Sequence, residues 1–161
     1  MKTLIVYTSN HGTTEKVAYM ISSEMQALGS SSIEVIPLKQ IYRVDINSFD
    51  QIIIGTSIHA GNPPSEMTTY LDKSMNFLLT KRCALYLIGM NEKEIAKSMD
   101  KAFPKKLREH SIETEYLGGE FIFEKMNFIE RTLVRRITGF KKSVSLLKTD
   151  KIKSFAKKLV P

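Results

Sequence analysis

The sequence lacks the features typical of secreted and membrane-spanning proteins: its 161 residues include one cysteine, no tryptophan and no apolar run of bilayer length. A single cysteine, Cys83, cannot form an intramolecular disulfide, which fits a reducing compartment. A membrane-spanning helix needs about 20 apolar residues. The opening stretch "MKTLIVYTSN" has neither the long apolar core nor the small-residue cleavage site of a signal peptide. We therefore expect a cytoplasmic protein in which Cys83 is a buried structural thiol.

Acidic residues are also scarce, with 17 aspartates and glutamates against 24 lysines and arginines, a net charge of +7. Such an excess favours an anionic partner, which could be a phosphate or carboxylate ligand, a nucleic acid or an anionic lipid surface. The fractions of hydrophobic (42%) and charged (25%) residues are those of a globular protein. The length predicts one domain covering residues 1–161.

Short apolar, β-branched runs alternate along the chain with segments of helical spacing. The runs are nearly continuous, as in strands covered on both faces, and they occupy residues 2–7, 33–38, 51–57 and 83–89. Helices are predicted at 13–28, 65–78, 92–110 and 149–160, with the third kinked or divided at Pro104. Residues 111–123 predict a fifth strand. This alternation predicts an α/β three-layer sandwich, a parallel sheet with helices on both faces.

Ligands of such sheets bind beyond the carboxyl ends of the strands, so the loops at 8–14, 57–63 and 89–92 are the candidate sites. The first, "TSNHGTT", lacks both the G-x-G-x-x-G fingerprint and the Gly-Lys-Ser/Thr ending of a P-loop. It offers polar side chains and a glycine just before a helix, namely Ser9, Asn10, Gly12, Thr13 and Thr14. This loop is either an anion-binding nest at the helix N-terminus or simply a well-capped helix start.

The stretch "YTSNHGTTEK" (7–16) resembles the phosphate loop of flavodoxin-like proteins, which typically reads Ser/Thr-x-Thr-Gly-x-Thr. Ser9, Gly12 and Thr14 match this pattern, and His11 replaces the middle threonine. The resemblance implies that the loop holds the monophosphate of FMN and that the five strands lie in the order 2-1-3-4-5. His11 then either donates a hydrogen bond to the phosphate or faces solvent.

The same resemblance implies that the isoalloxazine ring of FMN lies between the loops "GTSIHAGNPPSEM" (55–67) and "GMNEKE" (89–94). The expected contacts are Ser57, Ile58, His59, Ala60, Gly61, Asn62, Gly89, Met90 and Asn91. His59 is either an exposed loop residue or a group near the ring or the substrate. Since the chain has no tryptophan, one face of the flavin is expected to be comparatively open unless Ile58 or Met90 covers it.

A basic amphipathic insert, "EKMNFIERTLVRRITGFKKS" (124–143), separates the fifth predicted strand from the last helix. Its apolar residues recur at helical spacing: Met126, Ile129, Leu133, Ile137 and Phe140. Three interpretations remain open: a surface helix packed on the domain, an interfacial helix for anionic lipid, or a lid. A lid would offer Arg131, Arg135 and Arg136 to an acidic substrate. No nucleic-acid-binding motif is present, so we expect no nucleic-acid partner.

The loop "IIIGTSIHAG", the basic surface and the insert before the last helix together resemble the menaquinone-dependent protoporphyrinogen oxidase group. The resemblance implies an FMN enzyme that dehydrogenates protoporphyrinogen IX to protoporphyrin IX and passes electrons to a quinone at the inner face of the cell membrane. The two propionates of a porphyrin suit a basic insert, although this insert is modest in length and has no tryptophan.

Two other functions are compatible with the sequence. One is a flavodoxin-type electron carrier that docks a protein redox partner, and the other is a flavin-free structural or regulatory descendant. The sequence identifies no catalytic acid or base, and no metal site is expected.

Overall fold

The computed structural model describes residues 1–161 and contains a sheet of five parallel strands in the order β2-β1-β3-β4-β5. The strands are β1 (Thr3–Tyr7), β2 (Ile33–Pro37), β3 (Gln51–Ser57), β4 (Arg82–Ile88) and β5 (Glu113–Tyr116). The longer helices packed on the sheet are α1 (Thr13–Ala27), α2 (Ser65–Leu78) and α6 (Thr149–Leu159). The predicted fold class and strand order are confirmed.

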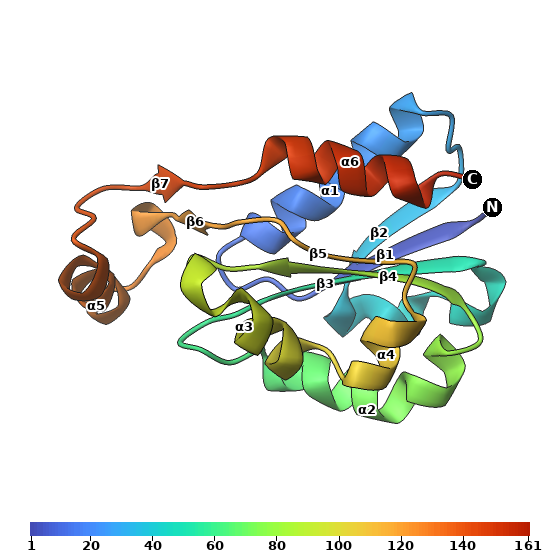
Figure 1. Ribbon diagram of the computed structural model, residues 1–161, viewed down its shortest axis with the longest axis horizontal. Coiled ribbons are helices and arrows are strands. Elements are labelled where there is room, and N and C mark those ends of the chain that lie inside the picture. Colours follow the sequence, from blue (N-terminus) through green and yellow to red (C-terminus); the bar gives the residue numbers. More distant parts are fainter.

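The helices form two layers, α1 and α6 on one face of the sheet and α2 with two shorter helices on the other (Figure 1). Successive strand residues point to opposite faces, so Ile53 packs under α1 and α6 while Ile52 and Ile54 pack against the α2 layer. Each face thus has its own apolar core. This explains why the strand sequences are continuous runs of apolar residues and do not alternate with polar ones.

Cys83 is fully buried in the α2-side core, as predicted. Its thiol lies 3.2 Å from the carbonyl oxygen of Leu78, and burial raises the pKa of the thiol to about 12. A thiol that stays protonated at neutral pH is a poor nucleophile, so Cys83 is a structural residue.

The predicted third helix, 92–110, is instead three short pieces. These are the 3₁₀ turn η3 (Glu92–Glu94) and the helices α3 (Ile95–Ala102) and α4 (Lys105–His110). The chain becomes extended at Phe103, directly before Pro104. A residue before proline is pushed out of the helical region, so Pro104 divides the helix and does not merely kink it.

The predicted fifth strand, 111–123, is also interrupted, because β5 ends at Tyr116 and a separate strand β6 covers Glu120–Phe121. Gly118 has a positive φ of 80°, and a Cβ at this position would collide with the carbonyl oxygen of Leu146. Only glycine tolerates this conformation and this approach of another backbone. The chain therefore leaves the sheet at the glycine pair.

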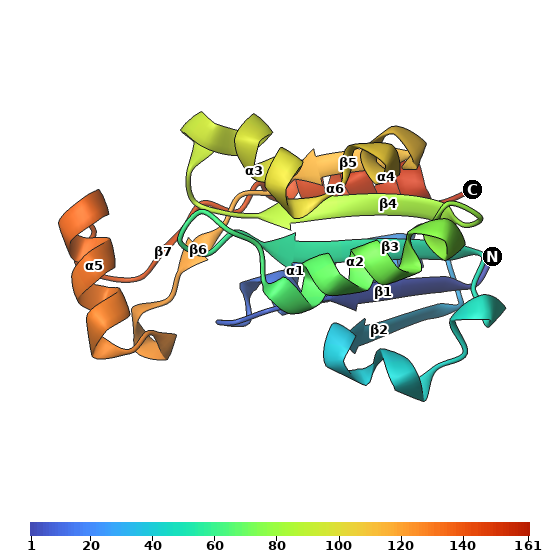
Figure 2. The same cartoon turned by 90° about the horizontal axis from the view of Figure 1, so that it is seen from below.

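Residues 120–145 form a projecting segment that stands away from the sheet in both ribbon views (Figure 2). It contains an antiparallel pair of β6 with β7 (Val144–Ser145), a 3₁₀ turn η4 (Phe123–Lys125) and the helix α5 (Phe128–Thr138). Helix α5 buries none of its residues. The interpretation of the insert as a helix packed on the domain surface is therefore wrong.

Two further 3₁₀ turns, η1 (Leu38–Arg43) and η2 (Ile46–Ser48), connect β2 to β3. None of the helices combines the length and the apolar character that crossing a bilayer would require.

Candidate cofactor-binding site

A cavity of about 920 Å³ lies where β1, β3 and β4 end, between their three loops and α5. This is within the range of roughly 300–1,000 Å³ for small-molecule and cofactor sites. Most of the residues predicted to bind the cofactor line it: Ser9, Asn10, His11, Thr13, Thr14, Ser57, Ile58, His59, Ala60, Gly61, Gly89, Met90 and Asn91. Gly12 and Asn62 do not line it. The three predicted loops thus converge on one site.

Hydrogen bonds of buried hydroxyl groups hold the two ends of the phosphate loop in place. The hydroxyls of Thr8 and Thr56 are 2.8 Å apart and join the ends of β1 and β3. The fully buried Tyr86 donates from its hydroxyl to the carbonyl oxygen of Thr14, 3.1 Å away. Gly55 makes room for this ring, because a Cβ on Gly55 would lie within the ring of Tyr86. The loop therefore starts from a rigid base.

The turn of the phosphate loop is made by Gly12, which has a φ of 89° and is the N-cap of α1. Its N–H donates to the Ser9 hydroxyl at 3.0 Å, and no cap side chain bonds to the first turn of the helix. The first-turn N–H groups are therefore available to an anion. The geometry is that of an anion nest, and the alternative of a helix start capped by its own side chains is not what the structure shows.

Lys125, from η4 in the projecting segment, lies against this turn. A Cβ built on Gly12 would be 2.8 Å from the Lys125 ammonium nitrogen. Lys125 was not predicted as a site residue, because in the sequence it contributes only to the net charge of the insert. No sequence signal reveals the contact, which joins residues 113 positions apart. The fold thereby supplies the cation that the loop itself lacks.

An acidic side chain, Glu120, also lies at the edge of the cavity, near Thr13. Burial pushes the pKa of Glu120 upward, but hydrogen bonds from Lys16 at 2.7 Å and Ser145 at 2.8 Å outweigh burial and hold it below its ordinary value. The carboxylate is therefore ionised and neutralised locally by Lys16. This ion pair ties α1 to the projecting segment.

The loop after β3 turns tightly at its tip. His59 and Asn62 exchange backbone hydrogen bonds of 2.9 and 3.1 Å, and Ala60 and Gly61 both have positive φ. Lys101 of α3 donates to the Gly61 carbonyl oxygen and to the Asn62 side chain, which ties the tip to the sheet body.

The loop after β4 is held by Tyr116, whose hydroxyl donates to the carbonyl oxygen of Gly89. Burial, and then the charge of Glu92, raises the pKa of Tyr116 to about 12, so its hydroxyl stays protonated at neutral pH. Tyr116 also lines the cavity. This aromatic residue was not predicted as a site residue, because it belongs to a strand and not to one of the three loops.

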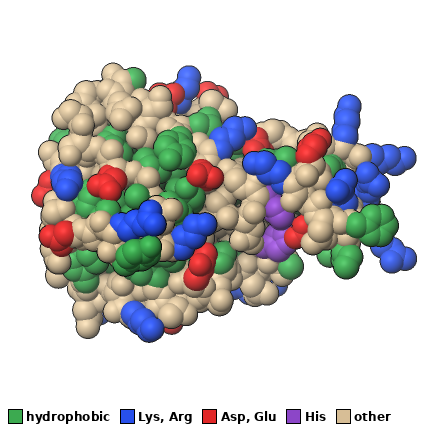
Figure 3. Space-filling view, turned by 180° about the vertical axis from the view of Figure 1, so that it is seen from behind, with side chains coloured by type: hydrophobic (Ala, Val, Ile, Leu, Met, Phe, Trp, Pro, Cys, Tyr) green, Lys and Arg blue, Asp and Glu red, His purple; other side chains and the backbone are tan.

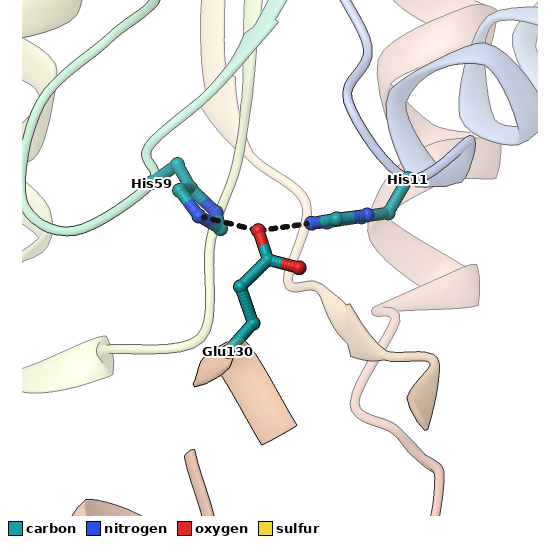
Figure 4. Close-up of side chains that lie close together, drawn as sticks. All are labelled: His11, His59 and Glu130. Atoms are coloured by element: carbon teal, nitrogen blue, oxygen red, sulfur yellow. Dashed lines mark ion pairs between the residues drawn. The ribbon is translucent and has the colours of Figure 1, made fainter. Parts of the chain in front are cut away.

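Three side chains converge between the loops and α5 (Figure 4). The Nε2 atoms of His11 and His59 each lie 3.6 Å from the same Oε1 atom of Glu130, and the two rings are 5.5 Å apart. Glu130 was not predicted as a site residue. Its other oxygen accepts from the backbone N–H of Asn127 in a capping box, which fixes the orientation of the carboxylate.

The side of α5 that faces the cavity carries Glu130, Leu133, Val134 and Ile137. The three arginines predicted to contact a substrate are not among the cavity-lining residues. Arg131 donates from Nε to the Met126 carbonyl oxygen, and Arg135 lies 5.5 Å from the centre of the Phe123 ring. Arg136 is exposed. These substrate contacts stay predictions.

The sequence of residues 4–145 matches the model of the flavodoxin domain family. This chain belongs to the flavodoxin domain family. The flavodoxin-like resemblance is thereby confirmed, and the family assignment supports FMN as the cofactor of the cavity. The site fits a phosphate-bearing cofactor, since no side chain caps the first turn of α1 and the Lys125 ammonium lies beside Gly12.

Among curated relatives, protoporphyrinogen IX dehydrogenase (quinone) of Escherichia coli is 27% identical over 105 residues, which cover 65% of this chain and 55% of the relative. A flavodoxin of Clostridium saccharobutylicum is 30% identical over 79 residues, 49% of each chain. The matches thus span about half the length of these relatives. Oxidised flavodoxin 2 from Bacillus cereus has a TM-score of 0.64 and 21% identity, over 98% of this chain and 97% of that one.

Proposed function

We propose that this flavodoxin-domain protein is an FMN-dependent oxidoreductase that dehydrogenates protoporphyrinogen IX to protoporphyrin IX and passes the electrons to a quinone. The observation that carries the proposal is the position of α5. Its side chains Leu133, Val134 and Ile137 form an apolar wall of the cavity that also contains the loops after β3 and β4. A cavity of about 920 Å³ with such a wall offers a large, mostly apolar macrocycle a place beside the cofactor. The E. coli relative supports this choice of substrate.

The chain's own residues would bind and orient the reactants. The phosphate of FMN would lie on the loop of Ser9, Asn10, Thr13 and Thr14 with Lys125 as counter-charge, and the ring between the loops at 57–61 and 89–91. FMN supplies the redox chemistry, because it exchanges electrons as a hydride or singly, while the protein sets its position. The arginines of α5, Arg131, Arg135 and Arg136, would receive the two propionates at the rim.

The outer surface of the projecting segment fits a peripheral contact with an anionic membrane. Phe128 and Ile129, which do not line the cavity, are 80% and 76% exposed. Figure 3 shows hydrophobic and basic side chains together at the end of this projection. Exposed apolar residues next to arginine and lysine are typical of helices that lie in the membrane interface. The protein would then be cytoplasmic and would bind peripherally to the inner face of the cell membrane. Its cofactor site would thus be close to a membrane quinone.

The decisive experiment is anaerobic mixing of the FMN-loaded protein with protoporphyrinogen IX. We expect the visible absorption band of the flavin to bleach at once. Porphyrin fluorescence should appear when a quinone is added, because the loss of six hydrogens from protoporphyrinogen IX takes three turnovers of a two-electron flavin. A flavin that stays oxidised with the porphyrinogen, yet is bleached normally by a chemical reductant, would overturn the proposed substrate.

The second candidate is an electron carrier that docks a protein redox partner, which the sequence match to a flavodoxin favours. A variant with a Gly-Ser linker in place of 128–138 tests the enzyme proposal against this alternative. Because the variant retains Lys125 and the phosphate loop, the change should not remove FMN binding. The enzyme proposal expects retained FMN binding and lost oxidation of the porphyrinogen. Unchanged oxidation by this variant would contradict a role for α5.

A further inference from the structure

The cluster of His11, His59 and Glu130 brings together side chains from three separate parts of the chain. His11 belongs to the phosphate loop, His59 to the tip of the loop after β3, and Glu130 to the first turn of α5. One ligand atom from each lies within 4.8 Å of the other two (Figure 4). Their sequence positions form no recognisable metal-binding motif, so the cluster could not be expected from the sequence.

The contacts within the cluster leave its polar atoms incompletely satisfied. The 3.6 Å from each imidazole Nε2 to the Glu130 Oε1 exceeds ordinary hydrogen-bond length. The His11 Nε2 is buried and has no hydrogen-bond partner. Since the other oxygen of Glu130 is occupied by the capping box, Oε1 is the atom directed at both imidazoles. Two imidazole nitrogens and one carboxylate oxygen thus converge on one point.

We propose that this cluster binds a divalent transition-metal ion such as Zn²⁺. Two histidines and a glutamate form a known set of zinc ligands that leaves a fourth, open position. Ligand atoms about 2.0–2.1 Å from a tetrahedral zinc are about 3.3 Å apart. The two 3.6 Å separations to the carboxylate therefore need only a small contraction, while the two imidazole nitrogens, within 4.8 Å of each other, would move together by rotation of their rings. Imidazole together with carboxylate suits zinc better than magnesium or calcium, which prefer oxygen ligands alone.

A metal here would cross-link the projecting segment to both cofactor loops. Helix α5 has no buried residue of its own, so the bond to Glu130 would hold it over the cavity. The ion would lie beside the loop that receives the dianionic phosphate of FMN, where its positive charge is favourable. We therefore infer that the metal and FMN bind together. The site itself does not depend on which substrate the protein oxidises.

The test is isothermal titration calorimetry of the 161-residue, FMN-loaded protein with Zn²⁺, repeated after removal of FMN. We expect one equivalent of Zn²⁺ to bind in both forms. His59→Ala and Glu130→Gln should each weaken binding by about 100-fold or more, since loss of mere outer-shell groups already costs 10–100-fold. Glutamine at position 130 can still complete the capping box, so α5 should stay folded.

His110→Ala is the matched control, because the third histidine lies at the end of α4 and its Nε2 contacts the Lys81 carbonyl oxygen. This variant should bind Zn²⁺ like the unmodified chain. No stoichiometric binding in either form, or equal binding by the control and the two cluster variants, would overturn the site. Binding only after FMN removal would overturn the joint binding of metal and cofactor. Far-UV circular dichroism and FMN retention check that each variant is folded.

Discussion

The sheet body and the projecting segment are stabilised in different ways. In the body, the strands are covered on both faces, and residues such as Phe155 and Ile53 are almost completely inaccessible to solvent. In the projecting segment, α5 is held by its capping box, by a glycine C-cap and by a few polar contacts to the cofactor loops. The large apolar side chains of α5 face solvent or the cavity.

This difference separates stability from recognition. Burial of apolar surface is the dominant favourable term in folding, so the body carries the stability and fixes the cofactor loops. The projecting segment buries little, and its residues are therefore available to ligands, lipids or partners. Polar contacts join the two regions, among them Lys125 at Gly12, Lys16 with Glu120, and the cluster around Glu130.

The largest contrast is expected from truncating one phenylalanine in each region. Phe155→Ala, in the core, should lower the free energy of unfolding by about 3–5 kcal/mol, because it leaves a cavity beside Tyr86. Phe128→Ala, on α5, should change it by no more than about 0.5 kcal/mol, since the side chain is exposed. Urea unfolding followed by circular dichroism measures both. An equal decrease in the free energy of unfolding for both variants would show that α5 contributes to the core.

Membrane binding should depend on the basic residues of the projecting segment and not on those of the body. Arg136→Gln with Lys141→Gln should weaken binding to phosphatidylserine-containing vesicles about 30-fold, at about 1 kcal/mol for each cation. The control is Lys153→Gln with Lys157→Gln on α6, which removes the same charge from exposed positions of the body. Vesicle co-sedimentation should show the control unchanged. The proposed membrane contact would fail if both pairs weakened binding equally.

Lys125→Met tests the contact between the projecting segment and the phosphate loop. Since hydrogen bonds to charged groups contribute about 1.5–3 kcal/mol, we expect FMN affinity to fall about tenfold or more in a fluorescence titration. Riboflavin, which has no phosphate, should bind both proteins equally. Lys142→Met, a surface lysine of the same segment, is the control and should leave FMN binding unchanged. An equal loss of affinity for riboflavin would show that Lys125 does not act on the phosphate of FMN.

The smallest expected effect concerns Glu120. Its pKa lies below the ordinary value of 4.5, so the ion pair with Lys16 stabilises the fold above that pH and is lost as the pH falls. Glu120→Gln should lower the free energy of unfolding at pH 7 by about 1 kcal/mol and flatten its decrease toward acid. Urea unfolding at pH 3–7 measures this. An unchanged dependence of the unfolding free energy on pH would mean that the ion pair does not stabilise the contact between α1 and the projecting segment.

Much of the body was predictable because its signals are local. The apolar runs at 2–7 and 51–57 identify buried strands, and the loop at 8–14 has the residue types of an anion nest. The errors arose where a single residue overrode a pattern. Pro104 divided a helix, and Gly118 ended a strand that composition alone would have continued to Phe123.

The projecting segment was predicted as a basic amphipathic helix, but its partners were not. The helical spacing of Ile129, Leu133 and Ile137 is visible in the sequence. Which side of that helix faces the cavity depends on how the paired strands β6 and β7 orient the segment. The spacing of apolar residues in the sequence does not contain this information.

By itself, the sequence determined the alternation of strands and helices, the covering of the strands on both faces and the three loops that converge on the cofactor. Each of these depends on the period of apolar residues or on a short motif, and both act between near neighbours in the chain. Only the tertiary structure decided that Lys125 lies on Gly12, and that Glu130 meets His11 and His59. Such contacts join residues 70 or more positions apart, so they depend on the path of the whole chain.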